Sequence, residues 1–337
     1  TLILAGQGRV DLTADMTGSL SDPLIRMDVA SYLTDAEEQA LANAVTLVSH
    51  GTLSKTIADP DAFGAPLIAI GAGNSFENAG TVRATGGQYY RLTVVAGGGT
   101  MINSGVIEVR QADAFNGSFY SPYDKTKVIN SGLIREAANG DGRSRGIVNA
   151  NELINSGTID MGGTAVVYDY LVYGADLTNN GLIRSANGAA ITGSYDVVSI
   201  RNEADGVIQG GGIGTAIALG NGQISNAGTL KGDVRFGDRY YSGPGFYIAD
   251  GGTIEGNLRF AGANDMFLQV GDDLGVTGTI DGGDGQDMFG RVFTQDATVM
   301  LGGRPDIGFE HDYLLAQTGA TVSIDASATS RDTLFVG

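Results

Sequence analysis

The chain has 337 residues, of which 42% are hydrophobic and 54 are glycine, and its formal net charge is −18. A nucleic-acid backbone requires a basic face, so this acidic composition argues against nucleic-acid binding and favours a soluble protein. The sequence contains no cysteine, which excludes a disulfide framework, a zinc–thiolate site and a cysteine nucleophile.

The N-terminal segment, 1–45, differs from the rest of the chain. Its opening run "TLILAGQGRV" is too short for the core of a signal peptide, so we expect a mature or excised chain. The stretch 33–45, "LTDAEEQALANAV", predicts a short helix that Thr34 or Asp35 caps, with Glu37 and Glu38 in its first turn. We interpret 1–45 as an N-terminal cap that covers the exposed strand edges of the first repeat.

A repeat of about 25 residues fills 46–300. The phrases "MINSGVIEV", "VINSGLIRE", "LINSGTIDM" and "LTNNGLIRS" are four of its copies. The position of the first Asn in each copy aligns Ser49, Asn78, Asn103, Asn130, Asn155, Asn179, Asn202, Asn226, Asp250 and Val276. Glycine usually follows two residues later, and an aliphatic residue four residues later, at Leu53, Val82, Ile107, Ile134, Ile159, Ile183, Leu230, Ile254 and Ile280.

This period predicts a stack of β-strand coils. The apolar residues alternate within each copy and runs at helical spacing are absent, so leucine-rich, ankyrin and tetratricopeptide repeats do not fit. One coil of a right-handed parallel β-helix, with two or three short strands and the turns between them, uses about this many residues. We expect an all-β solenoid of such coils over 46–300, followed by C-terminal coils or a capping segment over 301–337.

The Asn and Gly positions have a structural interpretation. Glycine admits the positive φ that sharp bends use, and Asn tolerates a left-handed turn and bonds its own backbone. In coils stacked about 4.8 Å apart, equivalent Asn side chains form an amide ladder. The predicted ladder residues are Asn78, Asn103, Asn130, Asn155, Asn179, Asn202 and Asn226.

The repeated "INSGTI"-type phrases, followed by "GANDMFLQVGDDLGVTGTIDGGDGQDMF" and "GFEHDYLLAQTGATVSID", resemble the passenger region of bacterial autotransporters. The resemblance covers most of the chain from residue 46 onward. It implies a parallel β-helix that is secreted across the outer membrane and serves as an adhesin, a surface structure or an enzyme carrier.

Two groups of side chains are candidates for ligand contacts. The stretch "GGDGQDMF" matches one copy of a calcium-binding repeat, which makes Asp281, Asp284 and Asp287 candidate Ca²⁺ ligands; the alternative is plain acidic turns. The insertion at 111–127 and the stretch "RFGDRYYSGPGFYI" gather aromatic residues that suit sugar rings or a protein partner. The alternative is that these rings cover the flank of the solenoid. The candidate binding residues are Phe115, Phe119, Tyr120, Tyr123, Tyr240 and Tyr241.

We therefore expect an extracellular or cell-surface bacterial protein that presents an extended β-helix for structural or adhesive contact. Its expected partners are a host or neighbouring-cell surface, a glycan or a second copy, and no apolar run is long enough for a transmembrane helix. One alternative is a polysaccharide lyase or hydrolase on the same fold, with paired Asp residues or His50 and His311 as candidate acids and bases. Another is the subunit of a filament that assembles head to tail.

Overall fold

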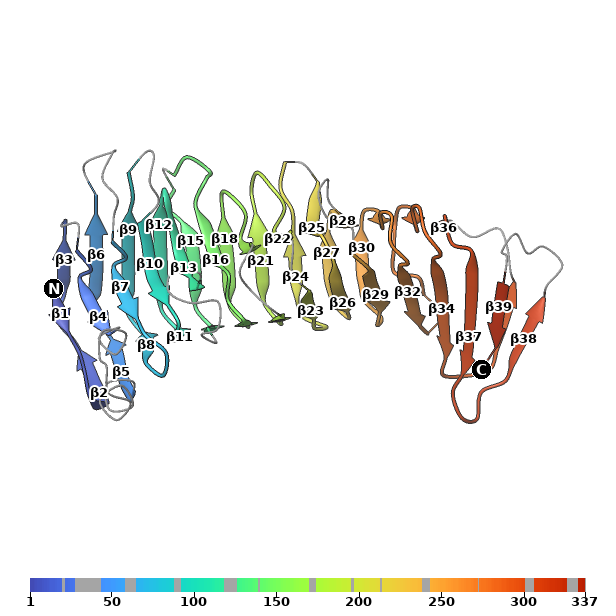
Figure 1. The fold of residues 1–337 in the computed structure, drawn as a ribbon, viewed down its shortest axis with the longest axis horizontal. Helices are drawn as coiled ribbons and strands as arrows, with labels where there is room; N and C mark the ends of the chain where they lie inside the picture. Colours follow the sequence, from blue (N-terminus) through green and yellow to red (C-terminus); the bar gives the residue numbers. More distant parts are fainter. Residues whose placement is uncertain are drawn as a thin grey trace.

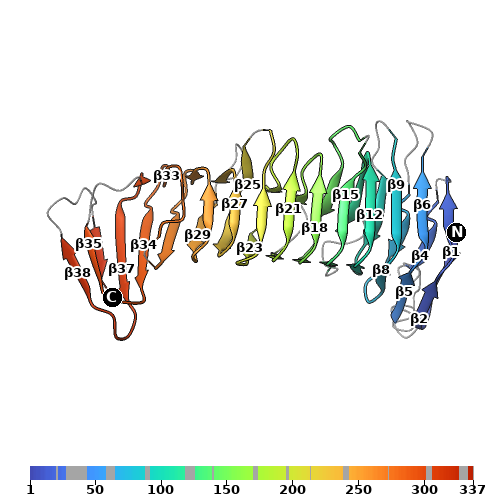
Figure 2. The ribbon, with the colours of Figure 1, turned by 180° about the vertical axis from the view of Figure 1, so that it is seen from behind.

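A computed structural model describes 1–19, 22–27, 44–57, 65–87, 92–117, 126–138, 140–169, 174–194, 197–212, 214–237, 243–271, 273–300, 306–325 and 333–336. The described residues form an all-β parallel solenoid of the right-handed type with about 11 turns. Its strands lie side by side along the long axis, with the two termini at opposite ends (Figure 1), and the view from behind shows the same stacking (Figure 2). No helix occurs among these residues.

Each typical coil supplies one strand to each of three sheets, which we call A, B and C. Every strand pairs in parallel with the equivalent strand of the next coil. Sheet A comprises β1 (Leu2–Ile3), β4 (Ile25–Met27), β7 (Ile68–Ile70), β10 (Leu92–Gly97), β13 (Ala112–Asn116), β16 (Arg145–Val148), β19 (Val166–Tyr168), β22 (Ile191–Gly193), β25 (Thr215–Leu219), β28 (Asp233–Phe236), β31 (Leu258–Arg259), β33 (Ile280–Asp281) and β36 (Asp306–Ile307).

Sheets B and C follow in each coil. Sheet B comprises β2 (Gln7–Leu12), β5 (Ala44–Ser49), β8 (Ser75–Asn78), β11 (Thr100–Asn103), β14 (Lys127–Asn130), β17 (Glu152–Asn155), β20 (Ala175–Asn179), β23 (Val198–Asn202), β26 (Gly222–Asn226), β29 (Gly245–Ala249), β32 (Met266–Val270), β34 (Met288–Phe293), β37 (His311–Ala316) and β39 (Thr333–Val336). Sheet C comprises β3 (Met16–Gly18), β6 (Thr52–Thr56), β9 (Thr81–Thr85), β12 (Val106–Arg110), β15 (Leu133–Glu136), β18 (Thr158–Met161), β21 (Leu182–Ser185), β24 (Val207–Gln209), β27 (Thr229–Lys231) and β30 (Thr253–Glu255).

The core is a set of stacked apolar columns. In sheet C the aliphatic residue four positions after the Asn slot pairs with its equivalent in the next coil, so like side chains stack along the axis. The inward residues of this column, including Ile208 and Ile254 where the turn is longer, are fully buried: Leu53, Val82, Ile107, Ile134, Ile159, Ile183, Ile208, Leu230 and Ile254. The two-residue alternation of the sequence therefore directs one side chain inward and the next outward in each strand.

The described part of the N-terminal segment is itself a coil. Strands β1, β2 and β3 pair in parallel with β4, β5 and β6, so 1–19 begin all three sheets. Most of the helix predicted over 33–45 lies outside the described residues, whereas Ala44 and Val45 begin strand β5. The strand architecture thus extends on the N-terminal side of the boundary that the repeat pattern places at residue 45.

The C-terminal coils depart from the aligned repeat, and two predicted slots are wrong. Asn226 pairs with Ala249, one residue before the predicted Asp250. Val276 lies outside sheet B and makes an isolated bridge with Ile254, while Ile280 belongs to sheet A. The Asp250 slot shifts because the turn after β29 gains a residue at Gly251, where φ is +82°. The Val276 slot is lost because sheet C ends at β30.

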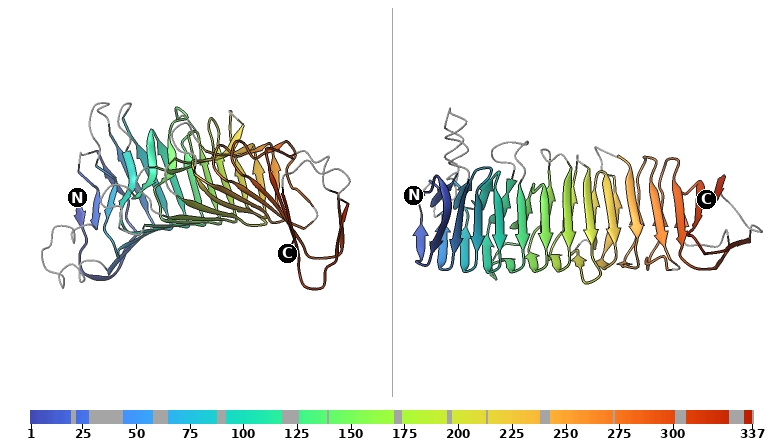
Figure 3. Two further views of the ribbon diagram at one scale, coloured as in Figure 1. Left: turned by 45° about the vertical axis from the view of Figure 1, so that its right-hand side comes forward. Right: turned by 90° about the horizontal axis from the view of Figure 1, so that it is seen from below.

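After β34, strands β35 (Ala297–Met300) and β38 (Val322–Asp325) form a separate two-stranded sheet. It has a small core of its own, built around Phe293, Val299 and Leu314. Figure 3 shows this end of the solenoid from two further directions. Strand β39 continues sheet B beside β37.

The glycine two residues after the Asn slot is required by close packing. Its φ is not in the left-handed region at Gly80, Gly105, Gly132 or Gly157, which corrects the expectation of positive φ there. A Cβ at Gly132 would instead lie 2.2 Å from the carbonyl oxygen of Gly105 in the preceding coil. Each coil can follow its neighbour this closely only because the position has no side chain.

Replacing Gly132 by alanine should therefore destabilise the protein by about 1–3 kcal/mol, because the added methyl group forces two backbones apart. Gly262→Ala is the matched control, since its Cβ would meet only the Asp284 carbonyl oxygen at 4.0 Å. Chemical denaturation would measure both variants. Equal stabilities for the two would show that the Gly132 position tolerates a side chain.

Candidate functional site

A column of buried asparagine amides runs along the corner between sheets B and C. Each side-chain Nδ2 donates to the Oδ1 of the next coil at 2.7 or 2.8 Å. Every member is completely buried: Asn78, Asn103, Asn130, Asn155, Asn179, Asn202 and Asn226. The second N–H of the amide also donates to backbone, as from Asn130 to the carbonyl of Thr158 at 3.3 Å. The amides thus satisfy one another and hold the corner of every coil in place.

Removing one member interrupts this column. Asn130→Ala leaves the Nδ2 of Asn103 and the Oδ1 of Asn155 buried without their partners, which should lower the free energy of unfolding by about 1–3 kcal/mol. Ser131→Ala, at the exposed neighbouring position, should change it little. Thermal and chemical denaturation of both variants test the contribution, and a loss shared by S131A and N130A would contradict it.

The candidate aromatic residues divide into two groups. Phe115 lies in β13, is completely buried and pairs with Val95 and Ile147. Its assignment as a binding residue is therefore wrong, because an inward position of the strand alternation places the ring in the core. The other candidates lie outside the described residues: Phe119, Tyr120, Tyr123, Tyr240 and Tyr241.

Several neighbouring aromatic residues also belong to the core. Tyr168 and Tyr247 are buried, and Tyr247 stacks on Phe267 with ring centroids 5.8 Å apart. Phe236 stacks on Phe260 at 5.0 Å. The C-terminal coils therefore use stacked rings where the earlier coils use aliphatic side chains.

A cavity of about 380 Å³ lies where two aromatic-rich segments of the sequence enter sheet B. Thr126 and Lys127 follow directly after 118–125, which contains Phe119, Tyr120 and Tyr123, and Gly174 follows directly after 170–173. The Lys127 ammonium pairs with the Glu152 carboxylate at 2.8 Å. The remaining lining is polar and acidic, and the complete lining is Thr100, Thr126, Lys127, Asn151, Glu152, Gly174 and Asp176.

A second polar cavity, of about 400 Å³, lies between turns of neighbouring coils. Its carboxylates already have partners. Glu136 accepts hydrogen bonds from the hydroxyl of Ser144 at 2.9 Å and from the backbone of Gly142 at 3.2 Å, and Asp160 pairs with Arg184. These contacts give the carboxylates a role in holding the turns.

Asp265 and Asp287 form a buried acidic pair in successive coils. Asp265 accepts from the backbone N–H of Gly245 at 2.6 Å, and Asp287 accepts from that of Asp265 at 2.7 Å. Glu310 continues the column by accepting from the backbone of Asp287 at 2.9 Å. Burial, supplemented by the nearby Asp287 charge, raises the pKa of Asp265 to about 6, and burial also raises the pKa of Asp287.

The three predicted calcium ligands do not converge. Asp287 faces this buried column, Asp284 is exposed, and Asp281 accepts from the backbone of Gly283 at 3.1 Å. Among the described residues, no group of three or more His, Asp and Glu side chains is arranged to hold a metal ion. In this structure the carboxylates of Asp281 and Asp287 each accept a hydrogen bond from a backbone N–H.

The raised pKa of Asp265 makes stability depend on pH. Because the folded-state pKa exceeds the unfolded value, this carboxyl stabilises the fold when protonated, and that contribution is lost as pH rises through about 6. Asp265→Asn keeps an acceptor for Gly245 and removes the charge. Between pH 4 and pH 8, the free energy of unfolding of this variant should rise relative to that of the parent by up to about 3 kcal/mol.

Asp284→Asn, at an exposed turn of the neighbouring coil, is the control and should follow the pH dependence of the parent. Denaturant titrations at pH 4 and pH 8 provide the measurement. An Asp265→Asn variant whose difference from the parent is the same at both pH values would contradict the assignment.

Lys55 is a buried cation that the repeat pattern gives no reason to expect. Its side chain is 1% exposed, and Nζ donates to the carbonyls of Asp22 at 2.7 Å, Ala65 at 2.8 Å and Pro66 at 3.4 Å. Burial lowers the pKa of Lys55 to about 8. Three carbonyl acceptors match the three ammonium protons, so Lys55 ties strand β6 to two neighbouring segments.

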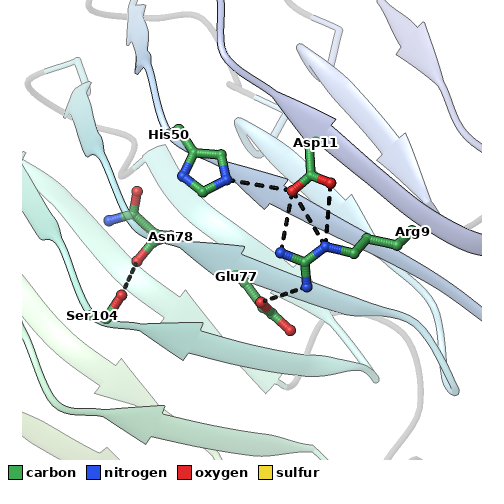
Figure 4. Close-up of polar contacts among 6 residues, drawn as sticks. All are labelled: Arg9, Asp11, His50, Glu77, Asn78 and Ser104. Carbon is green, nitrogen blue, oxygen red and sulfur yellow. Dashed lines mark hydrogen bonds and ion pairs between the residues drawn. The ribbon is translucent and has the colours of Figure 1, made fainter.

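The two histidines lie on different coils near opposite ends. His50 Nε2 lies 3.3 Å from Asp11 Oδ1, within the exposed cluster that joins Arg9 to Asp11 and Glu77 (Figure 4). The Arg9 guanidinium bonded to Asp11 holds the pKa of that carboxyl below its usual range. His311 Nε2 lies 3.2 Å from Gln286 Oε1. The two rings therefore do not belong to one site.

The outward face of sheet C carries an alternating column of charge that the phrase alignment does not reveal. Strand pairing places Glu108 between Arg83 and Arg135, and Asp160 between Arg135 and Arg184. The Arg135–Glu108 contact is 2.7 Å and the Arg83–Glu108 contact is 3.6 Å. Reading the residue one position after the inward aliphatic residue in each repeat would have identified this column.

Comparisons with protein-family models, with curated proteins and with solved structures found no match. Among the described residues, no helix is long and apolar enough to cross a membrane.

Proposed function

We propose that this chain is an exported bacterial surface protein that presents an extended β-solenoid for structural or adhesive contact. The observation that carries the proposal is the cavity beside Thr126 and Lys127, at the point where the aromatic-rich segment 118–125 returns to sheet B. The resemblance of the repeated phrases to autotransporter passengers supports the bacterial surface location. The absence of cysteine is consistent with export.

The contrast between a regularly packed interior and a variable outer surface supports attachment as the role. The interior is filled by stacked aliphatic columns and by the amide ladder, so the side chains available to a partner are those outside it. Insertions between strands change these outer surfaces without disturbing the pairing of coils. Tyrosine and phenylalanine side chains at such an insertion suit a glycan or a protein surface.

The test is a triple substitution of Phe119, Tyr120 and Tyr123 by serine. Attachment of the purified chain to cells or to an immobilised glycan panel should fall tenfold or more, because an aromatic anchor contributes about 2 kcal/mol or more to a contact. The circular-dichroism spectrum and melting temperature should stay close to those of the parent.

Tyr89→Ser with Tyr90→Ser removes aromatic rings from a different segment and should leave attachment intact. Phe115→Ser is the opposite control and should destabilise the fold, because Phe115 is in the core. Full attachment by the triple variant would overturn the assignment of 118–125. Cleavage of a polysaccharide by the purified chain would replace attachment with the enzymatic alternative.

A further inference from the structure

From β11 to β37 the outward face of sheet B has three bands along the axis, and the strands before β11 carry Glu77 and Asp11 in the middle column of this face. In the middle outward column the first band is aliphatic, with Ile102, Ile129 and Ile154, and the second is polar, with Thr178, Arg201 and Ser225. The third band covers strands β29, β32, β34 and β37 and is apolar except at His311. Its partly exposed members are Phe246, Ile248, Met266, Leu268, Val270, Met288, Val292, Tyr313 and Leu315.

These side chains point away from the core. Ile129 and Leu268 are partly exposed, whereas their strand neighbours Val128 and Phe267 are completely buried. The alternation within each strand therefore places the aliphatic and apolar bands on the outer surface. A contiguous apolar surface of this kind on an acidic protein is typical of an interaction site.

The order of residues in the middle column is nearly symmetrical about strand β23. Thr178 and Ser225 lie on either side of Arg201, followed outward by Ile154 and Ile248. The next positions are Ile129 and Leu268, and then Ile102 and Gly290. A column with this symmetry can pack against a reversed copy of itself, with apolar residues opposite apolar or small ones.

We propose that two copies of this chain associate through the outer faces of sheet B, related by a two-fold axis parallel to strand β23. Rotation about this axis reverses the order of the strands and keeps their direction. Ile129 of one copy then meets Leu268 of the other, and Ile154 meets Ile248. The inference is drawn from this sheet face alone, although Thr100, Lys127, Glu152 and Asp176 on it also line the cavity of the proposed adhesive role.

The charges on this face are compatible with the reversed arrangement. The chain carries a net charge of −18, so two copies repel wherever carboxylates face each other. The outward positions of strands β29, β32, β34 and β37 hold no carboxylate among the described residues. At the centre, Arg201 is neutralised by Glu203 of its own chain at 2.7 Å.

The early coils of this face carry the outward carboxylates of Glu152 and Asp176. The reversed arrangement keeps these carboxylates of the two copies apart, because Glu152 and Asp176 lie opposite Phe246 and Gln223 of the other copy. Glu152 is also paired with Lys127 of its own chain at 2.8 Å.

Side-chain size along the edge of the face is also complementary. The residue after the Asn slot is small in the early coils, at Ser104 and Ser131, and is replaced by Val292 and Val270 in the late coils. Reversal of the strand order places Ser131 opposite Val270 and Ser104 opposite Val292. Large side chains of one copy therefore meet small ones of the other, which allows the two sheets to approach.

The available area is sufficient for a dimer of moderate affinity. The nine strands from β11 to β34 span roughly 38 Å at about 4.8 Å per step, and three outward positions span about 15 Å across. The face therefore offers on the order of 600 Å² per copy, or about 1,200 Å² in total, at the lower limit of specific protein interfaces.

Sedimentation velocity of the full chain across a concentration series tests the proposal. We expect a monomer–dimer equilibrium that tightens as salt screens the repulsion between copies. Ile129→Lys or Leu268→Glu alone should weaken dimerisation tenfold or more, because each sets a charge against an apolar partner. The double variant should recover most of the loss, because each new lysine then faces a new carboxylate of the other copy.

Gln209→Glu adds a charge to the outward face of sheet C and is the matched control; it should dimerise like the parent. Melting temperatures near that of the parent would show that all variants fold. A strictly monomeric parent would overturn the proposal, and binding of an apolar dye to that monomer would indicate a different occupant. The proposal would also be overturned if the double variant did not recover dimerisation, or if Q209E weakened dimerisation as much as the single variants do.

Discussion

The close stacking of successive coils is the constraint on which the rest of this structure depends. Parallel pairing brings equivalent residues of neighbouring coils together, so any side chain at a corner must be compatible with a copy of itself one strand spacing away. Asparagine meets this requirement because its amide both donates and accepts, and the buried column from Asn78 to Asn226 uses both capacities. Glycine meets it two residues later in the same turn by having no side chain at all.

This constraint fixes what the interior can contain and leaves variation to the outside. Inward positions hold aliphatic residues in the early coils and stacked rings in the late ones, where Phe289 tilts against Phe267 with centroids 4.8 Å apart. After the amide ladder ends at Asn226, the same column continues as Ala249, Gln269 and Arg291. The C-terminal coils thus rely on aromatic packing and on backbone-capping carboxylates instead.

The phrase alignment was sufficient to predict the parallel coils, the inward aliphatic column and the Asn column, because each follows from residues that recur in the same local order. It failed at Asp250 and Val276, where inserted turn residues and the end of sheet C change the register without changing the apparent phrase. It also placed Phe115 on the surface, because composition alone cannot distinguish the inward from the outward positions of an unaligned strand. The three bands on sheet B emerge only when the strands are paired, whereas the charge column on sheet C follows from the residue after each inward aliphatic position.

The amide ladder should make its coils the most stable part of the solenoid, and hydrogen exchange measured along the chain is the most direct test. Amides that open only with a stable cooperative unit exchange slowly and together. We expect the strands of the coils from β8 to β26 to form one slowly exchanging unit, with faster exchange in the coils after β29. Equal or greater protection in the coils after β29 would contradict this expectation.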